Sequence, residues 1–254
     1  MSLNVLSLFA GIGGLELGLE RAGMNTVGQV ELDPYCRSVL ARHWPEVPQH
    51  DDVRTAPEWW LAEQRPRVDV VAGGPPCQPF SSLGLGLGVG DERWGWPWMA
   101  DVVRAVEPRY VVVENVPRLL RDADAFGWIL GDLHRLGFDA EWSLVPACAM
   151  GAPHTRDRVF LVAYPAGSDG EQPLHLQAAV EAGRAGARTA GRDARADRWL
   201  PEPDVGRVAH GVPKQLVAPG LHALGNAVVP QVAEFVGRLI VAHHRISTGQ
   251  GVSA

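Results

Sequence analysis

A cysteine suited to covalent chemistry stands in the stretch Gly-Gly-Pro-Pro-Cys-Gln-Pro-Phe-Ser, residues 73–81. The apolar residues 68–72 before it are typical of a buried strand. Cys77 is therefore expected beyond the carboxyl end of that strand, with prolines restricting the backbone on both sides. Ligands of open parallel α/β sheets bind outside the carboxyl ends of the strands, so a thiol there is suited to nucleophilic catalysis. The alternative is a buried structural cysteine, but this stretch offers few side chains for core packing.

A glycine-rich turn, Ala-Gly-Ile-Gly-Gly at residues 10–14, separates a predicted first strand (4–9) from a predicted helix (15–23). Such a turn lets a ligand approach the backbone at the helix N-terminus. Dinucleotide sites need the pattern Gly-x-Gly-x-x-Gly, and Glu16 occupies its last position, so the sequence argues against that class. A plain strand–helix turn without a ligand remains an alternative.

Three acids follow predicted strands. Glu31 ends the strand predicted at 26–32 and could accept hydrogen bonds from ribose hydroxyls. Asp52 ends a short third strand, or caps the helix after it. Glu114 directly follows the apolar residues 109–113, and a charged residue in that place is either paired or functional.

The elements that must position these residues alternate between strand and helix, which predicts an α/β fold with a mostly parallel sheet. Asp33 and Pro34 are expected as the N-cap and first residue of a helix. Further helices are predicted at 99–106, 125–136 and 231–240, and further strands at 139–145 and 159–163.

Several motifs, taken in order, resemble those of the DNA (cytosine-5) methyltransferases. They are Phe-Ala-Gly-Ile-Gly-Gly (9–14), Gly-Pro-Pro-Cys-Gln-Pro-Phe-Ser (74–81), Glu-Asn-Val (114–116), Arg-Asp-Arg (156–158) and Gly-Asn-Ala-Val-Val-Pro (225–230). The chain departs from the family pattern at His154, where glutamine is expected, and at Ala227, where serine is frequent.

The resemblance implies a Rossmann-like class I methyltransferase fold with helices on both faces of the sheet, and S-adenosyl-L-methionine as cofactor. Cys77 would add to C6 of cytosine, Glu114 would stabilise the adduct at N3, and Arg156 and Arg158 would orient the base and its sugar-phosphate. The target base would be flipped out of the duplex, and the loop 84–90 would close over it. The implied cofactor contacts are Phe9, Gly11, Ile12, Gly13, Gly14, Glu31, Leu32, Asp52, Val53, Gly74, Pro75, Asn226 and Val228.

Composition limits the other classes of function. The 254 residues are 46% hydrophobic, which is ordinary for a globular chain. The net charge of −6 argues by itself against nucleic-acid binding, so any DNA surface must be local. The sequence shows neither a run of about eighteen apolar residues nor a basic N-terminal region, so we expect no membrane span and no signal peptide. Three widely spaced cysteines, Cys36, Cys77 and Cys148, suit a reduced cytoplasmic protein and predict no metal site.

Residues 166–219 are rich in Ala, Gly, Arg, Asp and Pro, so a loosely organised segment is predicted there. The resemblance assigns this range to target recognition. We therefore divide the chain into a catalytic domain (1–165), a small irregular target-recognition segment (166–219), a C-terminal motif and helix packing back on the catalytic domain (220–246), and a disordered tail (247–254).

Other assignments stay open at this point. A tRNA cytosine-5 methyltransferase would share every motif, and a non-catalytic DNA-binding component would share the fold. The tryptophans of residues 94–98 are suited either to stacking on a base or to packing the hinge of the loop before them. The expected partners are double-stranded DNA and a cognate restriction endonuclease acting on the same site, and the chain is expected to be a monomer.

Overall fold

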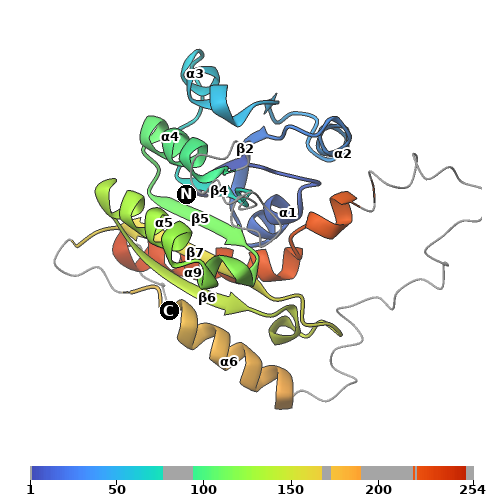
Figure 1. The fold of residues 1–254 in the computed structure, drawn as a ribbon, viewed down its shortest axis with the longest axis vertical. Coiled ribbons are helices and arrows are strands. Elements are labelled where there is room, and N and C mark those ends of the chain that lie inside the picture. The colour runs from blue at the N-terminus through green and yellow to red at the C-terminus, as the bar shows by residue number, and fades with distance from the viewer. Residues whose placement is uncertain (1, 77–93, 168–172, 190–219, 221, 250–254) are drawn as a thin grey trace, which may run out of the picture.

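A seven-stranded sheet forms the centre of the protein in the computed structural model, which describes residues 2–76, 94–167, 173–189, 220 and 222–249 (Figure 1). The strand order is β3-β2-β1-β4-β5-β7-β6. The strands are β1 (Asn4–Leu8), β2 (Asn25–Val30), β3 (Gln49–His50), β4 (Val70–Gly73), β5 (Tyr110–Asn115), β6 (Phe138–Val145) and β7 (Arg158–Pro165).

The topology creates a binding crevice at the carboxyl ends of β1 and β4. Strands β1 to β5 are parallel, and β7 alone runs against its neighbours. The chain builds outward from β1 to β3 and then returns to place β4 on the other side of β1. Ligands of open α/β sheets bind at such a switch point. The predicted mostly parallel sheet is confirmed.

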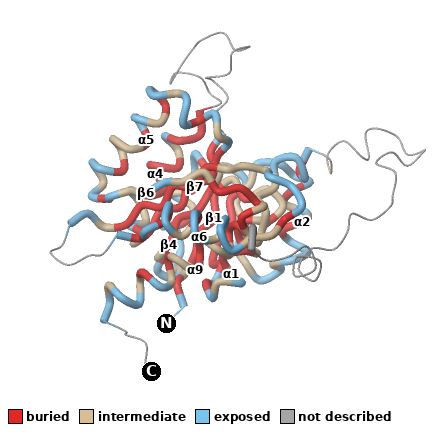
Figure 2. Tube along the Cα trace, turned by 90° about the horizontal axis from the view of Figure 1, so that it is seen from below, coloured by how far each residue is buried: buried red, intermediate tan, exposed pale blue. Residues whose placement is uncertain are grey.

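Helices cover both faces of the sheet, and each face has its own core. Helices α3 (Ala56–Leu61), α4 (Trp96–Val106) and α5 (Ala123–Arg135) pack on one face. Helices α1 (Gly14–Arg21), α6 (Leu176–Thr189) and α9 (Pro230–Ser247) pack on the other. The central strands β1, β4, β5 and β7 are buried between them, the edge strands β3 and β6 are partly exposed, and the outer faces of the helices are exposed (Figure 2). Helix α2 (Pro34–His43) and the 3-10 helices η1 (Val53–Thr55), η4 (Pro117–Arg121) and η5 (Ala147–Met150) complete the described elements.

Helices α1 and α9 pack backbone to backbone because glycines lie at their contact. A Cβ atom on Gly18 would come within 2.3 Å of the Pro230 carbonyl oxygen and within 2.4 Å of the Ala233 Cβ. A Cβ on Gly14 would come within 2.3 Å of the Val228 carbonyl oxygen. No real Cβ occupies such positions, so these glycines fix how closely the C-terminal segment approaches the first helix.

Local predictions hold at several positions. The Asp33 side chain caps α2 by accepting hydrogen bonds from the amides of Tyr35 and Cys36, and Pro34 opens the helix. Of the tryptophans in residues 94–98, Trp94 and Trp96 are buried in the core. Helix α4 therefore begins three residues earlier than predicted, because its apolar first turn packs inward.

Two predictions about disorder are wrong in part. Residues 176–189 form helix α6 within the range expected to be loosely organised, and Leu174, Leu176 and Val180 are buried. Helix α9 continues through Ser247, where a disordered tail was expected to begin, and the Ser247 hydroxyl accepts a hydrogen bond from Arg109. Residues 250–254 and 190–219 lie outside the described part of the chain, so the proposed domain division stays a prediction.

One stretch of the described chain, His222–Ser247, which contains α9 and the helical turn before it, is long and apolar enough to cross a membrane. Its apolar residues have another role, because Val232, Ala233, Val236 and Ile240 are buried in the core against the sheet. Among the described residues, no group of three or more His, Cys, Asp or Glu side chains could hold a metal ion.

Candidate active site

The turn after β1 has the backbone geometry of a tight ligand-binding loop. Phe9, Gly11 and Gly13 all have positive φ, at 53°, 58° and 87°. Such a conformation is strained for Phe9, which is not a glycine, and strain of this kind concentrates at functional sites. The Ala10 amide donates to the Val30 carbonyl oxygen at 3.1 Å, which ties the turn to the end of β2.

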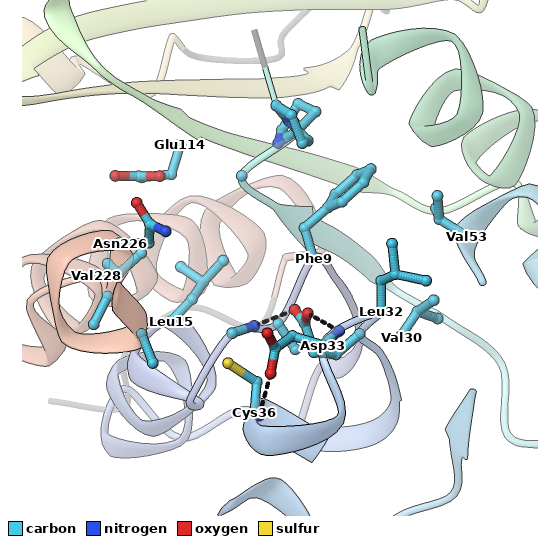
Figure 3. A pocket seen from close by; sticks show the side chains of 18 of the residues that line it. Phe9, Leu15, Val30, Leu32, Asp33, Cys36, Val53, Glu114, Asn226 and Val228 are labelled. Carbon is cyan, nitrogen blue, oxygen red and sulfur yellow. Dashed lines mark hydrogen bonds between the residues drawn. The ribbon is translucent and has the colours of Figure 1, made fainter. Parts of the chain in front are cut away.

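Glu31 joins this turn to the loop after β2. Its Oε2 accepts a hydrogen bond from the Gly11 amide at 2.7 Å, and its Oε1 accepts one from the Asp33 amide at 2.8 Å (Figure 3). A carboxylate has about four lone-pair sites, so two acceptor sites remain for hydroxyl donors from a ligand. The predicted ribose contact is compatible with this arrangement but untested.

Asp52 forms a bidentate ion pair with Arg54. The Arg54 Nε and Nη2 atoms lie 2.6 to 3.0 Å from the two carboxylate oxygens, and the Arg54 amide also donates to Oδ1 at 2.9 Å. These hydrogen bonds hold the pKa of Asp52 below its usual value. Asp52 also caps the short 3-10 helix η1. The alternative reading, in which an aspartate caps the helix that holds Glu58, is wrong, because Thr55 is the N-cap of α3. The Asp52 carboxylate is therefore oriented from within its own loop.

Glu114 is a buried carboxyl group beside two arginines. Its Oε1 lies 3.0 Å from the Arg158 Nε in an ion pair whose side chains are 9% and 19% exposed. Burial raises the pKa of Glu114 to about 7, although the charges of Arg158 and Arg156 act in the opposite direction. A Cβ on Gly74 would come within 2.9 Å of the Glu114 Oε2. The glycine thus lets the loop after β4 pass directly against this carboxyl group.

Asn115 fixes the start of the loop that leads to Cys77. Its Nδ2 donates to the Pro75 carbonyl oxygen at 2.9 Å, and its Oδ1 accepts from the Val116 amide at 2.9 Å. Farther along the chain, the Gly95 amide donates to the Pro76 carbonyl oxygen at 2.9 Å. Residues 77–93, with Cys77 and the predicted loop 84–90, lie outside the described residues. The described chain on either side of them is therefore held next to Glu114.

A cavity of about 920 Å³ connects these groups. In Figure 3, Glu114 and Asn226 lie on one side of Phe9, and Leu32 and Val53 on the other. The predicted site residues that line it are Phe9, Gly11, Gly14, Glu31, Leu32, Asp52, Val53, Gly74, Pro75, Glu114, Arg158, Asn226 and Val228.

Three predicted site residues are placed elsewhere. Ile12 and Gly13 belong to the first turn but are not among the described residues that line the cavity, and Gly13 packs against Trp44. Arg156 is also not among them. Its guanidinium instead bonds carbonyl oxygens of residues 224–227. The assigned roles of these three residues stay predictions.

Several lining residues had no role in the sequence prediction. Asn115 directly follows Glu114 in the Glu-Asn-Val motif, so its position was a usable signal, whereas nothing in the sequence pointed to Arg54. Cys36 also lines the cavity. Its burial, together with the carboxylates of Glu31 and Asp33, raises the pKa of its thiol to about 12, so Cys36 is unsuited to act as a nucleophile.

The cavity has the parts that a nucleoside-bearing cofactor and a second planar substrate would need. One end presents a positive-φ turn, the Glu31 carboxylate and the Asp52 carboxylate. The other end presents a carboxyl group that titrates near neutrality, with Arg158 beside it. Because the pKa of Glu114 is about 7, this end of the cavity is suited to proton transfer or hydrogen-bond donation to a substrate.

Comparison with known sequences identifies relatives that align with 63–64% of this chain. The chain is 34% identical over 168 residues to the type II methyltransferase M2.BsuMI of Bacillus subtilis, covering 63% of this chain and 42% of that protein. It is 36% identical over 165 residues to the type II methyltransferase M.NaeI of Lentzea aerocolonigenes, covering 64% of this chain and 40% of that protein. The chain thus spans somewhat less than half the length of these two curated relatives.

Solved structures share the same fold. A putative DNA modification methyltransferase from an Escherichia coli prophage matches with a TM-score of 0.55 and 28% identity, covering 65% of this chain and 47% of that one. The S. pombe Dnmt2 methyltransferase matches with a TM-score of 0.56 and 18% identity, covering 72% of this chain and 55% of that one, which is a likeness of fold alone. The predicted class I methyltransferase fold is confirmed. The C-5 cytosine-specific DNA methylase family model matches residues 3–185, more than half of the sequence, and the chain therefore belongs to that family.

Proposed function

We propose that this chain transfers a methyl group from S-adenosyl-L-methionine to C5 of a cytosine in double-stranded DNA. One observation carries the proposal. A single cavity joins the strained turn after β1 to the buried Glu114–Arg158 pair, beside the loop that leads to Cys77. Because the chain belongs to the C-5 cytosine-specific DNA methylase family, we assign this cavity to the methyl donor and the target cytosine.

The residues at the cofactor end fit S-adenosylmethionine. The two remaining acceptor sites of Glu31 suit the ribose hydroxyls. Asp52 is the proposed partner of the adenine amino group, which would share this carboxylate with Arg54. Leu32 and Val53 provide apolar surface for the adenine ring, and Asn226 and Val228 close the cavity opposite Phe9. When bound, the cofactor supplies an electrophilic methyl group on a sulfonium.

The residues at the other end would activate the base. Cytosine C5 is a poor nucleophile, and addition of the Cys77 thiolate to C6 would make it enamine-like. Glu114, whose pKa is raised to about 7 by burial, would in its protonated form donate a hydrogen bond to N3 and stabilise the adduct. Arg158, already paired with Glu114, would orient the base. Loss of the C5 proton and expulsion of Cys77 would end the cycle.

DNA is the substrate that the relatives favour, because the curated matches at 34–36% identity are named type II methyltransferases. We also propose a cognate restriction endonuclease for the same site, with this chain acting as a cytoplasmic monomer. The alignments cover only 40–46% of these relatives, so which part of the chain recognises the target sequence is an open question. Residues 166–219 are the proposed reader.

The test is transfer of a labelled methyl group to duplex DNA and, in parallel, to tRNA, followed by sequencing of the methylated positions. We expect label at C5 of cytosine in DNA. Cys77→Ser should abolish transfer and keep cofactor binding, and DNA containing 5-fluorocytosine should trap the wild type covalently. Label in tRNA alone would move the proposal to RNA, and trapping through another cysteine would refute the assignment of Cys77.

A further inference from the structure

The guanidinium of Arg156 bonds to the protein's own backbone. Its Nη2 donates to the carbonyl oxygens of Ala227 at 2.6 Å, Gly225 at 2.8 Å and Leu224 at 3.4 Å. Arg156 lies just before β7, with a positive φ of 32°, which is an uncommon conformation for a residue other than glycine. About 70 residues separate the arginine from its acceptors, so this is a tertiary contact.

Arg156 contacts the end of a short helical stretch. Residues 222–226 form a helical turn that stops before α9. Within it, the Ala227 amide lies 3.3 Å from the Leu224 carbonyl oxygen, and the Asn226 Nδ2 lies 3.4 Å from the His222 Nε2. The last carbonyl groups of a helix lack intrahelical partners, and an arginine can satisfy them. Arg156 supplies such a partner to the carbonyl oxygens of Gly225 and Ala227.

This segment forms one wall of the cavity. Its lining residues are His222, Ala223, Asn226, Ala227 and Val228. At its end the Val228 carbonyl lies against Gly14, the first residue of α1. Arg156 therefore holds residues 224–227 while α1 contacts Val228, and displacement of this stretch would change the cavity wall beside Gly14, in the turn assigned to the cofactor.

We propose that Arg156 is a positioning residue for the cofactor site: by holding residues 224–227 it sets the affinity for S-adenosylmethionine. The proposal rests on the proposed function for the identity of the cofactor. It differs from the role expected from the family resemblance, in which Arg156 would orient the sugar-phosphate of the target nucleotide.

The geometry favours the cofactor role because Nη2 already serves three backbone acceptors. The Nε and Nη1 atoms make no hydrogen bond to any residue that the structure describes. A contact from Nε or Nη1 to DNA would leave the hydrogen bonds from Nη2 to the backbone of residues 224–227 in place.

The experiment measures S-adenosylmethionine binding by calorimetry without DNA, for the wild type, Arg156→Ala and Arg156→Lys. Loss of hydrogen bonds from a charged donor predicts that Arg156→Ala weakens binding by roughly 10- to 100-fold, with partial rescue by lysine. The matched control is Arg184→Ala, which removes an exposed arginine bonded to one backbone carbonyl, that of Leu144. It should leave cofactor affinity unchanged.

A second measurement needs no cofactor. Hydrogen exchange of the amides of 222–228 should accelerate in Arg156→Ala and stay unchanged in Arg184→Ala. Unchanged exchange and cofactor affinity in Arg156→Ala, with weakened DNA binding, would overturn the proposal and support the sugar-phosphate role. A wild type that binds no S-adenosylmethionine would refute the proposed function, while the exchange measurement would still test the clamp. If Arg156→Ala fails to fold, the lysine variant carries both measurements.

Discussion

Glu16 is the most deeply buried acid in the described part of the chain, and its ionisation should limit stability at alkaline pH. Its side chain is fully buried, and neither carboxyl oxygen has a partner with good hydrogen-bond geometry among the described residues. Burial raises the pKa of Glu16 from 4.5 to about 7, and the charges of Glu20 and Glu31 act in the same direction. The Ser7 hydroxyl and the Glu16 backbone amide oppose this shift but do not cancel it.

The sign follows from proton binding. Between pH 4.5 and 7 the folded protein holds the Glu16 proton and the unfolded chain releases it, so stability falls as pH rises. Each pKa unit corresponds to about 1.4 kcal/mol, so a shift from 4.5 to about 7 corresponds to roughly 3 kcal/mol once the pH exceeds 7. Glu16→Gln keeps the shape of the side chain and removes the titration. Relative to the wild type, the variant should gain up to about 3 kcal/mol between pH 5 and pH 8.

The assay is urea unfolding of both proteins at several values between pH 5 and pH 8. Glu114 titrates in the same range but is present in both proteins, so its contribution cancels in the difference. Glu46→Gln, a change at an exposed position, is the control and should show no comparable trend. A stability difference between Glu16→Gln and wild type that stays constant with pH would refute the reasoning.

Three further outcomes follow from the structure. Methyl transfer should slow as pH rises through about 7, because Glu114 then loses the proton it donates. Glu114→Gln should reduce single-turnover rates by roughly 100-fold and remove this pH limb, whereas an unchanged limb would exclude Glu114 as its source. Glu31→Ala should weaken S-adenosylmethionine binding by roughly 1–3 kcal/mol, and unchanged affinity by calorimetry would make Glu31 a structural acid only. Gly18→Leu should lower the free energy of unfolding by at least about 1–3 kcal/mol, because the added side chain would overlap Ala233. A variant that unfolds near the wild-type temperature would contradict the packing of α1 on α9.

The sequence predicted elements well where local chemistry specifies them. The cap at Asp33, the apolar strands and the acids at strand ends all depend on neighbours within a few residues. Helix α6 shows the opposite case. The Glu141 carboxylate on β6 accepts hydrogen bonds from the amides of Leu174, His175 and Leu176 at the start of α6. A cap supplied from about 35 residues away has no local signal, and an Ala-, Gly- and Arg-rich composition therefore suggested loose structure.

In the site, too, the sequence indicated which residues matter, but the properties of those residues depend on tertiary contacts. Glu114 was identified because it ends a buried strand, but its pKa depends on Arg158 and on burial beneath the loop of Gly74. Asp52 was identified by its position, yet Arg54 decides how its carboxylate is oriented. Sequence position predicted many of the described residues that line the cavity but also included Ile12, Gly13 and Arg156, which are not among them. The ionisation and orientation of the lining residues depend on contacts that only the fold creates.

The C-terminal motif, residues 225–230, is the clearest case of a segment whose position depends on tertiary contacts. Residues 225–230 follow the first turn of the chain by more than 200 residues, and nothing local places them beside it. Gly14 admits the Val228 carbonyl, Gly18 admits the first turn of α9, and Arg156 bonds the carbonyl groups before them. These contacts join the segment to α1 and to the residue before β7. A substitution at Gly18 or Arg156 should therefore act on the cofactor site through this wall of the cavity, even though neither residue lines it.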